Sequence, residues 1–314
     1  MILSILGAGL LFAGCEKASP PHAKQAEPPT EFFFSAEHAS NALAHATLFV
    51  EACTPRDSGT PGASHAANWL HDRLVENGVS AALDSFKDDS PRGPRTYVNV
   101  LASLSGSDDQ WIVLLSHFDT KSGISDSFQG ANDGASSTGL LLELAVLMNR
   151  VTPRRHNILL AFLDGEECDM GYSDRDGFHG SKHLAKALKK EGRKIKAVIL
   201  MDMVGDRDLK LTVPRNSTPD LRVLALEAAD ATGDREKIGL FDGDIYDDHQ
   251  AFLDRGFHAV DLIDFDYGSS PGVNDYWHTT RDTIDKLSPD SLLATGRIVL
   301  EMVNRLSRPP SAQP

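Results

Sequence analysis

Five short segments of the sequence carry Asp, Glu and His side chains, the types that bind divalent metals through oxygen and nitrogen. His117 and Asp119 are two residues apart, so in an extended chain both side chains project from one face. That pair suits a histidine ligand with a neighbouring carboxylate that orients the imidazole ring. The other four segments are Asn132-Asp133-Gly134, Asp164-Gly165-Glu166-Glu167, Met201-Asp202-Met203 and Trp277-His278-Thr279.

Each segment alone also has an ordinary explanation, such as a surface ion pair, a turn or a packed aromatic residue. Asp202 is the least ordinary, because a carboxylate inside an apolar strand needs a partner or a cation. Taken together, the five segments predict a divalent metal site of the hydrolytic zinc type, for which no cysteine is required. Of the adjacent Glu166 and Glu167, one can bind the metal while the other stays free to transfer protons.

These segments follow predicted strands in a chain where helices and strands alternate. Apolar periodicity predicts helices over 32–52, 63–74 (ending at Gly78), 138–148, 181–190, 221–231 and 289–306. It predicts strands over 97–104, 111–115, 157–163, 195–203 and 259–263, the first two being neighbours split by a polar turn. The pattern indicates an α/β fold with one twisted, mixed and mostly parallel sheet between helix layers. In such sheets functional groups gather on loops at the carboxyl ends of the strands.

Composition narrows the class of protein. The 314 residues include 31 Lys and Arg against 45 Asp and Glu, a net charge of −14, which argues against nucleic acid as the main partner. A hydrophobic content of 41% is that of a globular protein. Three cysteines are too few for a disulfide framework, and the sequence leaves open whether Cys53 and Cys168 pair.

The first residues resemble an export signal. Residues 1–14 are apolar but too short to span a bilayer, and the small residues before Cys15 resemble a bacterial lipoprotein signal over residues 1–15. The segment lacks a basic start and has Phe12 where a smaller residue is usual, so an upstream start codon, a plain secretory signal and a buried strand stay open as alternatives. Residues 16–31 are rich in proline and read as a tether, and residues 32–314 as one catalytic domain. We expect an exported, periplasmic protein that meets the membrane only through a lipid on Cys15.

The motifs resemble those of zinc aminopeptidase family M28. The matching residues run from about Gly59 to Leu306, and the resemblance implies a twisted mixed sheet flanked by helices. The motifs are His117-Phe118-Asp119, Gly130-Ala131-Asn132-Asp133, Asp164-Gly165-Glu166-Glu167, Met201-Asp202 and His278-Thr279.

Three further features look like the glutaminyl-peptide cyclotransferase branch of that family, which converts N-terminal glutamine to pyroglutamate and releases ammonia. They are a twelve-residue insert over 168–179, the run Asp247-Asp248-His249, and Trp277 directly before His278. Other positions depart from the animal enzymes and suit a bacterial member. Ser116 and Thr138 stand at the positions of a disulfide, Asp261 at that of a histidine and Tyr172 at that of a tryptophan.

The resemblance implies a role for each site residue. In the cyclase reading, Asp133, Glu167 and His278 hold one Zn²⁺, and the substrates are peptides or proteins with N-terminal glutamine. Glu166 is the acid/base, Asp202 and Asp247 hold the α-amine, and Trp277 and Ile245 contact the substrate.

Two alternatives stay open. In an aminopeptidase, His117 and Asp202 bind a second Zn²⁺ bridged by Asp133, and Glu166 activates water. A non-catalytic receptor on the same fold is the third reading, and the retained Glu166 argues against it. The natural substrate and the oligomeric state stay open.

Overall fold

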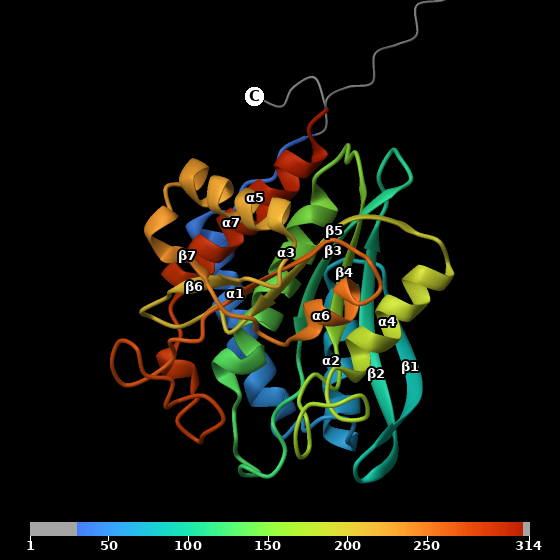
Figure 1. Ribbon diagram of the computed structural model, residues 1–314, viewed down its shortest axis with the longest axis vertical. Helices are drawn as coiled ribbons and strands as arrows, with labels where there is room; N and C mark the ends of the chain where they lie inside the picture. Colours follow the sequence, from blue (N-terminus) through green and yellow to red (C-terminus); the bar gives the residue numbers. More distant parts are fainter. Residues whose placement is uncertain (1–29, 310–314) are drawn as a thin grey trace, which may run out of the picture.

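A single eight-stranded sheet organises the computed structural model, which describes residues 30–309 (Figure 1). Its strand order is β1-β2-β4-β3-β5-β8-β6-β7. The four central strands β4, β3, β5 and β8 are parallel, and β1, β2 and β6 join through antiparallel pairings. The strands are β1 (Ala81–Ser90), β2 (Gly93–Leu104), β3 (Gln110–His117), β4 (Asn157–Leu163), β5 (Lys194–Asp202), β6 (Leu211–Pro214), β7 (Ile238–Phe241) and β8 (Ala259–Ile263).

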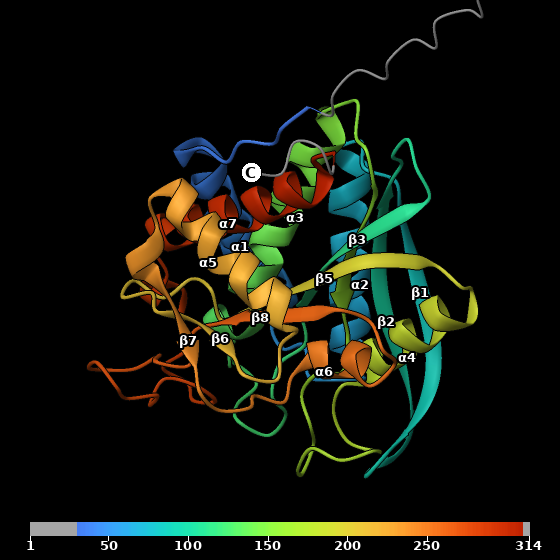
Figure 2. The ribbon, with the colours of Figure 1, turned by 45° about the horizontal axis from the view of Figure 1, so that its top comes forward.

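Helices cover both faces of the sheet. One apolar core joins α1, α2, α3, α5 and α7 to one face, and a second joins α4 and α6 to the other. Figure 2 shows α4 and α6 across the central strands from α1, α3 and α7. The helices are α1 (Ala36–Cys53), α2 (Pro61–Glu76), α3 (Ser137–Arg150), α4 (His179–Lys190), α5 (Pro219–Thr232), α6 (Asp248–Leu253) and α7 (Pro289–Ser307).

The central strands are apolar on both sides because both faces are covered. In β3, Ile112 and Leu114 pack into the first core, whereas the alternate residues Val113 and Leu115 pack into the second. All four side chains are completely buried. A continuous apolar run in the sequence is therefore what this position in the sheet requires.

Helix starts follow sequence signals that are local. Ser288 caps α7 by accepting a hydrogen bond from the Asp290 backbone, and Pro289 occupies the first helical turn. Thr60 caps α2 in the same way, again followed by a proline, Pro61. Because these residues satisfy free backbone N–H groups at the first turn, they fix where each helix begins.

The predicted fold class is confirmed, with one correction to its topology. Strands 97–104 and 111–115 are consecutive in the chain but are not neighbours, because β4 pairs with β2 on one side and β3 on the other. Strands β1, β6 and β7 were not predicted from the sequence. Strand β1 is an edge strand whose side chains are mostly not buried, so it lacks a regular apolar pattern, and the other two have four residues each.

The predicted export segment and the two cysteines in the folded part have different outcomes. The predicted signal segment with Cys15, and the tether up to residue 29, lie outside the described residues. Within residues 30–309, no helix has both the length and the apolar character needed to cross a membrane. Cys53 and Cys168 are both buried free thiols, so they do not form a disulfide with each other.

Candidate metal centre and active site

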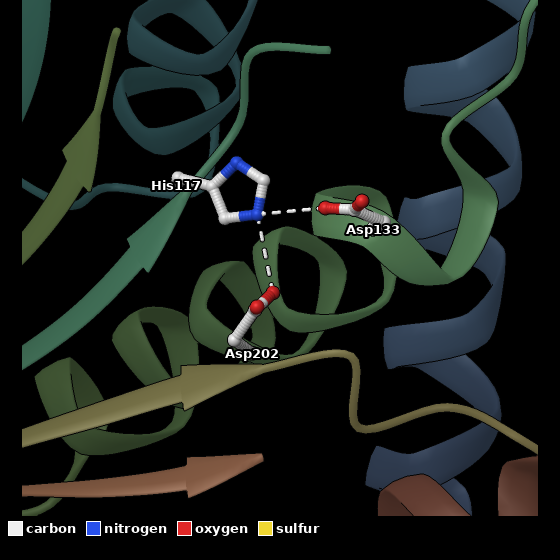
Figure 3. A group of neighbouring side chains, drawn as sticks. All are labelled: His117, Asp133 and Asp202. Carbon is white, nitrogen blue, oxygen red and sulfur yellow. Dashed lines mark hydrogen bonds and ion pairs between the residues drawn. The ribbon is translucent and has the colours of Figure 1, made fainter. Parts of the chain in front are cut away.

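Three predicted residues meet at the carboxyl edge of the central strands (Figure 3). His117 ends β3, Asp202 ends β5, and Asp133 lies in the short helical segment η1 (Ala131–Ser136) that precedes α3. The His117 Nε2 atom is 3.1 Å from Asp133 Oδ1 and 3.1 Å from Asp202 Oδ1. The three side chains are at least 90% buried and offer one nitrogen and two carboxylate donors to a common point.

A second group of three shares Asp133 with the first. His278, in the loop after β8, places its Nε2 atom 2.9 Å from Glu167 Oε1 and 3.3 Å from Asp133 Oδ2. Glu167 lies in the loop that follows β4. Asp133 therefore presents one carboxylate oxygen to each group, and the predicted ligands of both the one-zinc and the two-zinc readings lie together.

The donor atoms of both groups fit a zinc ion. Within each group the ligand atoms lie within 4.8 Å of one another, and all are nitrogen or carboxylate oxygen, which zinc accepts. Among the described residues, Asp133 Oδ2 and Glu167 Oε2 are buried without a hydrogen-bond partner. Only an ion-pair contact offsets the burial of each oxygen, with His278 Nε2 at 3.3 Å and with Lys121 Nζ at 3.6 Å, and a bound cation would lower the cost of that burial further.

The charges of the site compensate one another through its histidines. Burial lowers the pKa of His278, but its contacts with Asp133 and Glu167 outweigh this and raise the pKa to about 10. Burial raises the pKa of Asp133, yet its contacts with His117 and His278 hold that pKa well below its usual range. Burial and the charge of Asp133 raise the pKa of Glu167 to about 7. Positive charge between these carboxylates therefore stabilises them, and either protons or a metal ion can supply it.

Glu166 stands apart from both ligand groups, as expected for a proton carrier. Its Oε1 atom accepts a hydrogen bond from the Tyr172 hydroxyl at 3.0 Å. Burial, followed by the charge of Glu167, raises the pKa of Glu166 well above its ordinary value. A carboxyl group with a raised pKa can exchange a proton near neutral pH, which suits general acid/base catalysis.

Asp119 fixes the backbone of the glutamate pair. Its two carboxylate oxygens accept hydrogen bonds from the backbone N–H of Glu166 at 3.2 Å and of Glu167 at 3.1 Å. Its Oδ1 atom is also 3.6 Å from His117 Nδ1. The His117-x-Asp119 spacing thus places a carboxylate behind the histidine, as predicted, and adds a contact that the sequence did not indicate.

The two carboxylate oxygens of Asp247 have different surroundings. Its Oδ1 atom accepts a hydrogen bond from the backbone of Asp248 and so caps α6. Its Oδ2 atom is buried and has no hydrogen-bond partner among the described residues. Burial, then the charges of Asp261 and Asp202, raise the pKa of Asp247 well above its ordinary value. One oxygen is therefore structural, and the other is available to a ligand.

A cavity of about 590 Å³ opens beside these groups. Ile245 and Trp277 line it, and the Trp277 ring stacks on His278 with 3.9 Å between ring centroids. Except for His117, all the predicted catalytic, metal-binding and substrate-binding residues line this cavity. The lining residues from that predicted set are Asp133, Glu166, Glu167, Asp202, Ile245, Asp247, Trp277 and His278.

The departures from the animal enzymes have clear places in the structure. The Ser116 and Thr138 hydroxyl oxygens are 3.4 Å apart, so a polar contact occupies the disulfide position. Asp261 is completely buried on β8, with Oδ2 3.9 Å from His249 Nδ1. Tyr172 lines the cavity from the insert.

The sequence analysis missed two contacts at the glutamate pair. One is the Tyr172 hydrogen bond, and the other is Lys121, whose Nζ atom lies 3.6 Å from Glu167 Oε2. A single tyrosine or lysine in a loop carries no periodic signal. Only the three-dimensional fold brings these residues to the site.

The chain belongs to peptidase family M28, whose family model matches residues 99–303. Its relatives within that family include glutaminyl cyclases. It is 28% identical over 268 residues to the glutaminyl-peptide cyclotransferase of Drosophila melanogaster, covering 76% of this chain and 74% of that one.

Solved structures of bacterial glutaminyl cyclases agree with this placement. The enzyme of an Acidobacteriales bacterium is 33% identical with a TM-score of 0.80, covering 92% of this chain and 99% of the other. The Porphyromonas gingivalis enzyme is 26% identical with a TM-score of 0.76, covering 86% and 98%. The predicted resemblance to the bacterial cyclase branch is confirmed.

Proposed function

We infer that this protein is a glutaminyl-peptide cyclotransferase that converts N-terminal glutamine of peptides or proteins to pyroglutamate and releases ammonia. The observation that carries this inference is the similarity to bacterial cyclases over nearly the whole chain. It is joined by Glu166, a glutamate that belongs to neither ligand group and lies next to the ligand Glu167. The relatives make it an acyltransferase and do not favour the aminopeptidase alternative. The family is generally zinc-dependent, and the donor atoms here fit that metal.

We propose that Asp133, Glu167 and His278 hold one zinc ion. Three protein ligands leave an open position, as catalytic zinc sites require. Zinc bound there supplies Lewis-acid polarisation of the substrate γ-carbonyl. The Lys121 ammonium lies 3.6 Å from Glu167 Oε2, on the side of that ligand.

Glu166 is the proposed proton carrier. It accepts a proton from the substrate α-amine as the amine nitrogen forms a bond to the γ-carbonyl carbon. It then returns the proton to the amide nitrogen as the carbon–nitrogen bond breaks and ammonia leaves. Nucleophile and electrophile belong to one molecule, so the protein mainly orients them and compensates charge.

Asp202 and Asp247 are proposed to hold the α-amine, because both carboxylates line the same cavity as Glu166. Burial raises the pKa of both groups, so the pair can share a proton and act as donor and acceptor. Trp277 and Ile245 form apolar walls for the glutamine side chain. The Trp277 ring is held by its stacking on His278.

One pair of peptides tests the activity. The purified protein is given a Gln-initiated peptide and the matching Leu-initiated peptide, and ammonia, free amino acids and peptide mass are followed. We expect ammonia from the first peptide with a mass loss of one ammonia and no shortening, and no reaction of the second. Release of free leucine would instead establish an aminopeptidase.

We further propose that the protein is exported and anchored in a bacterial membrane through a lipid on Cys15, with a periplasmic catalytic domain. The support is the sequence alone: an apolar run ending in small residues before the cysteine, then a proline-rich stretch. Cys15→Ser should move the protein from the membrane fraction to the soluble fraction of cells that express the full chain. Equal membrane association of both forms would contradict the anchor.

A further inference from the structure

We propose that Tyr172 is a positioning residue whose hydroxyl holds the Glu166 carboxylate in the orientation needed for proton transfer. The inference rests on the proposed function, in which Glu166 carries the proton. The Tyr172 Oη atom donates a hydrogen bond to Glu166 Oε1 at 3.0 Å. A tyrosine hydroxyl keeps its proton at neutral pH, so it can donate this bond while the carboxylate is ionised.

The ring that carries this hydroxyl is fixed by its neighbours. Tyr172 stacks on Phe178 with ring centroids 4.6 Å apart and planes at 12°. The Lys121 ammonium lies 5.7 Å from the Tyr172 ring centroid. Gly177, at φ +83°, approaches the ring so closely that a Cβ there would lie 2.6 Å from a ring carbon. Tyr172 is 42% exposed, and these contacts hold its ring beside Glu166.

The insert around Tyr172 is itself held by a dense set of hydrogen bonds. The Asp176 carboxylate accepts backbone N–H groups of Asp169 at 2.6 Å, Met170 at 2.9 Å and Gly171 at 3.0 Å. The Lys182 ammonium donates to the backbone oxygens of Ser173 at 2.8 Å and Gly177 at 2.9 Å.

The start of the insert is tied to the loop after β3. There the Lys121 ammonium donates to the backbone oxygen of Cys168 at 2.5 Å. Because these contacts hold the twelve-residue insert in place, the Tyr172 hydroxyl is already positioned before the substrate binds. No conformational entropy has to be lost to order it at each turnover.

The hydrogen bond determines which part of Glu166 faces the reaction. With Oε1 engaged by Tyr172, the Oε2 atom is left to exchange the proton with the substrate. Without the hydroxyl, the carboxylate can rotate about its terminal torsion, which is intrinsically broad. The loss then falls on the chemical step, because Tyr172 acts through Glu166 and its hydroxyl is already engaged.

The test is Tyr172→Phe, which removes one oxygen and keeps the stacked ring. We expect kcat for a Gln-initiated peptide to fall about tenfold, as for the loss of one hydrogen bond to an ionised group. KM, zinc content and Tm should stay close to the wild-type values. Tyr276→Phe is the matched control, because Tyr276 is not among the residues that line the cavity with Glu166. It should retain wild-type kcat.

A second comparison separates action through Glu166 from a direct role. If Tyr172 acts only through that carboxylate, adding Tyr172→Phe to Glu166→Gln should lower the residual rate no further. An unchanged kcat in Tyr172→Phe, a rise in KM at constant kcat, or a full further loss in the double variant would each overturn the proposal.

Failure of the proposed function is a separate result. If the wild-type protein releases amino acids instead of ammonia, the cyclase assignment fails. The same variants are then compared on that hydrolysis, where Glu166 is again the proton carrier. Tyr172→Phe must again lower kcat about tenfold, or the positioning role is rejected as well.

Discussion

Asp133 divides its two carboxylate oxygens between two histidines, His117 at the end of β3 and His278 in the loop after β8, and this division defines the centre. Its Oδ1 atom contacts His117 and its Oδ2 atom contacts His278. Because the carboxylate is almost completely buried, both oxygens depend on these partners or on a cation. The same geometry can hold one ion on the His278 side or two ions, so the number of ions has to be measured.

The role of Glu166 can be tested without disturbing the ligands. Glu166→Gln should keep zinc and the fold but lose turnover by about 10²–10⁴-fold, the usual contribution of a general acid/base. Glutamine keeps the shape and can still accept the Tyr172 hydrogen bond through its amide oxygen. Steady-state kinetics with metal analysis on the same sample checks this. Near-normal turnover in a zinc-loaded variant would show that the proton carrier is another residue.

His117 distinguishes the one-zinc and two-zinc centres. It contacts Asp133 and Asp202 but neither Glu167 nor His278, so a single ion on the other side does not need it. We expect His117→Ala to bind as much zinc per chain as the wild-type protein. Elemental analysis after dialysis measures this. Loss of half the zinc would replace the one-zinc proposal with a two-zinc centre.

At this scale the sequence predicted the residues better than their contacts. The ligand candidates could be found because Asp, Glu and His recur at strand ends, where an α/β sheet collects its functional groups. The Tyr172–Glu166 and Lys121–Glu167 contacts could not, since they depend on how an irregular insert packs. Nor did the spacing of Asp119 show that it accepts the backbone N–H groups of both glutamates.

Among the elements, predictability followed burial. Strands β4 and β8 were predicted with the bounds that the structure has, because each is an apolar run covered on both faces. Strand β1 was missed because most of its side chains reach solvent. The position of β4 between β2 and β3 was also missed, since strand order depends on long-range pairing that a local pattern does not encode.

Helix α6 allows the two roles of Asp247 to be separated. Asp247→Ser keeps a residue that caps helices nearly as well, so α6 and the fold should persist. The buried Oδ2 atom is lost, and with it a charge-assisted hydrogen bond to the substrate amine, worth about 1.5–3 kcal/mol. We expect normal zinc content and thermal stability with cyclisation reduced by about 100-fold. Kinetics and a melting curve on one preparation measure both.

The matched control for that variant is another capping residue far from the cavity. Ser288→Ala removes the cap of α7 and should lower stability by about 1 kcal/mol without changing kcat. If Asp247→Ser instead cyclises at the wild-type rate, its carboxylate only caps α6, and the proposed amine contact is wrong.

For the molecule as a whole, a buried neutral histidine is one contribution to the pH dependence of stability. Burial lowers the pKa of His249 from 6.5 to about 3. Its Nε2 atom accepts a hydrogen bond from Asn216 at 3.1 Å, as a neutral ring can. Below pH 6.5 His249 binds a proton in the unfolded chain but stays neutral in the folded protein. The contribution of the neutral ring to the free energy of unfolding is therefore complete above pH 6.5 and is lost as the pH falls toward 3. The loss is about 1.4 kcal/mol per pH unit, or about 2 kcal/mol at pH 5.

Replacing that histidine should reduce the acid sensitivity. In His249→Gln, the drop in unfolding free energy between pH 7.5 and pH 5 should be smaller by about 2 kcal/mol than in the wild-type protein. Urea unfolding at the two pH values measures the difference. His65→Gln, at an exposed position on α2, should behave as the wild type does. An identical pH dependence in His249→Gln would mean that other buried groups control acid unfolding.

Removing the metal tests how strongly the centre stabilises the whole molecule. Asp133, Glu167 and His278 come from three segments that are far apart in the chain, so an ion bound to all three favours the folded state alone. At a free zinc concentration of about 1,000 times Kd this linkage is worth about 4 kcal/mol. In a domain of this size that corresponds to a Tm about 8 °C higher. We therefore expect a chelator to lower Tm by about that amount and added zinc to restore it. His278→Ala already lacks a ligand, so its Tm should respond little to either treatment. An unchanged Tm in wild-type protein that has demonstrably lost its zinc would mean that the buried carboxylates are satisfied without the ion, and that the ion serves the reaction alone.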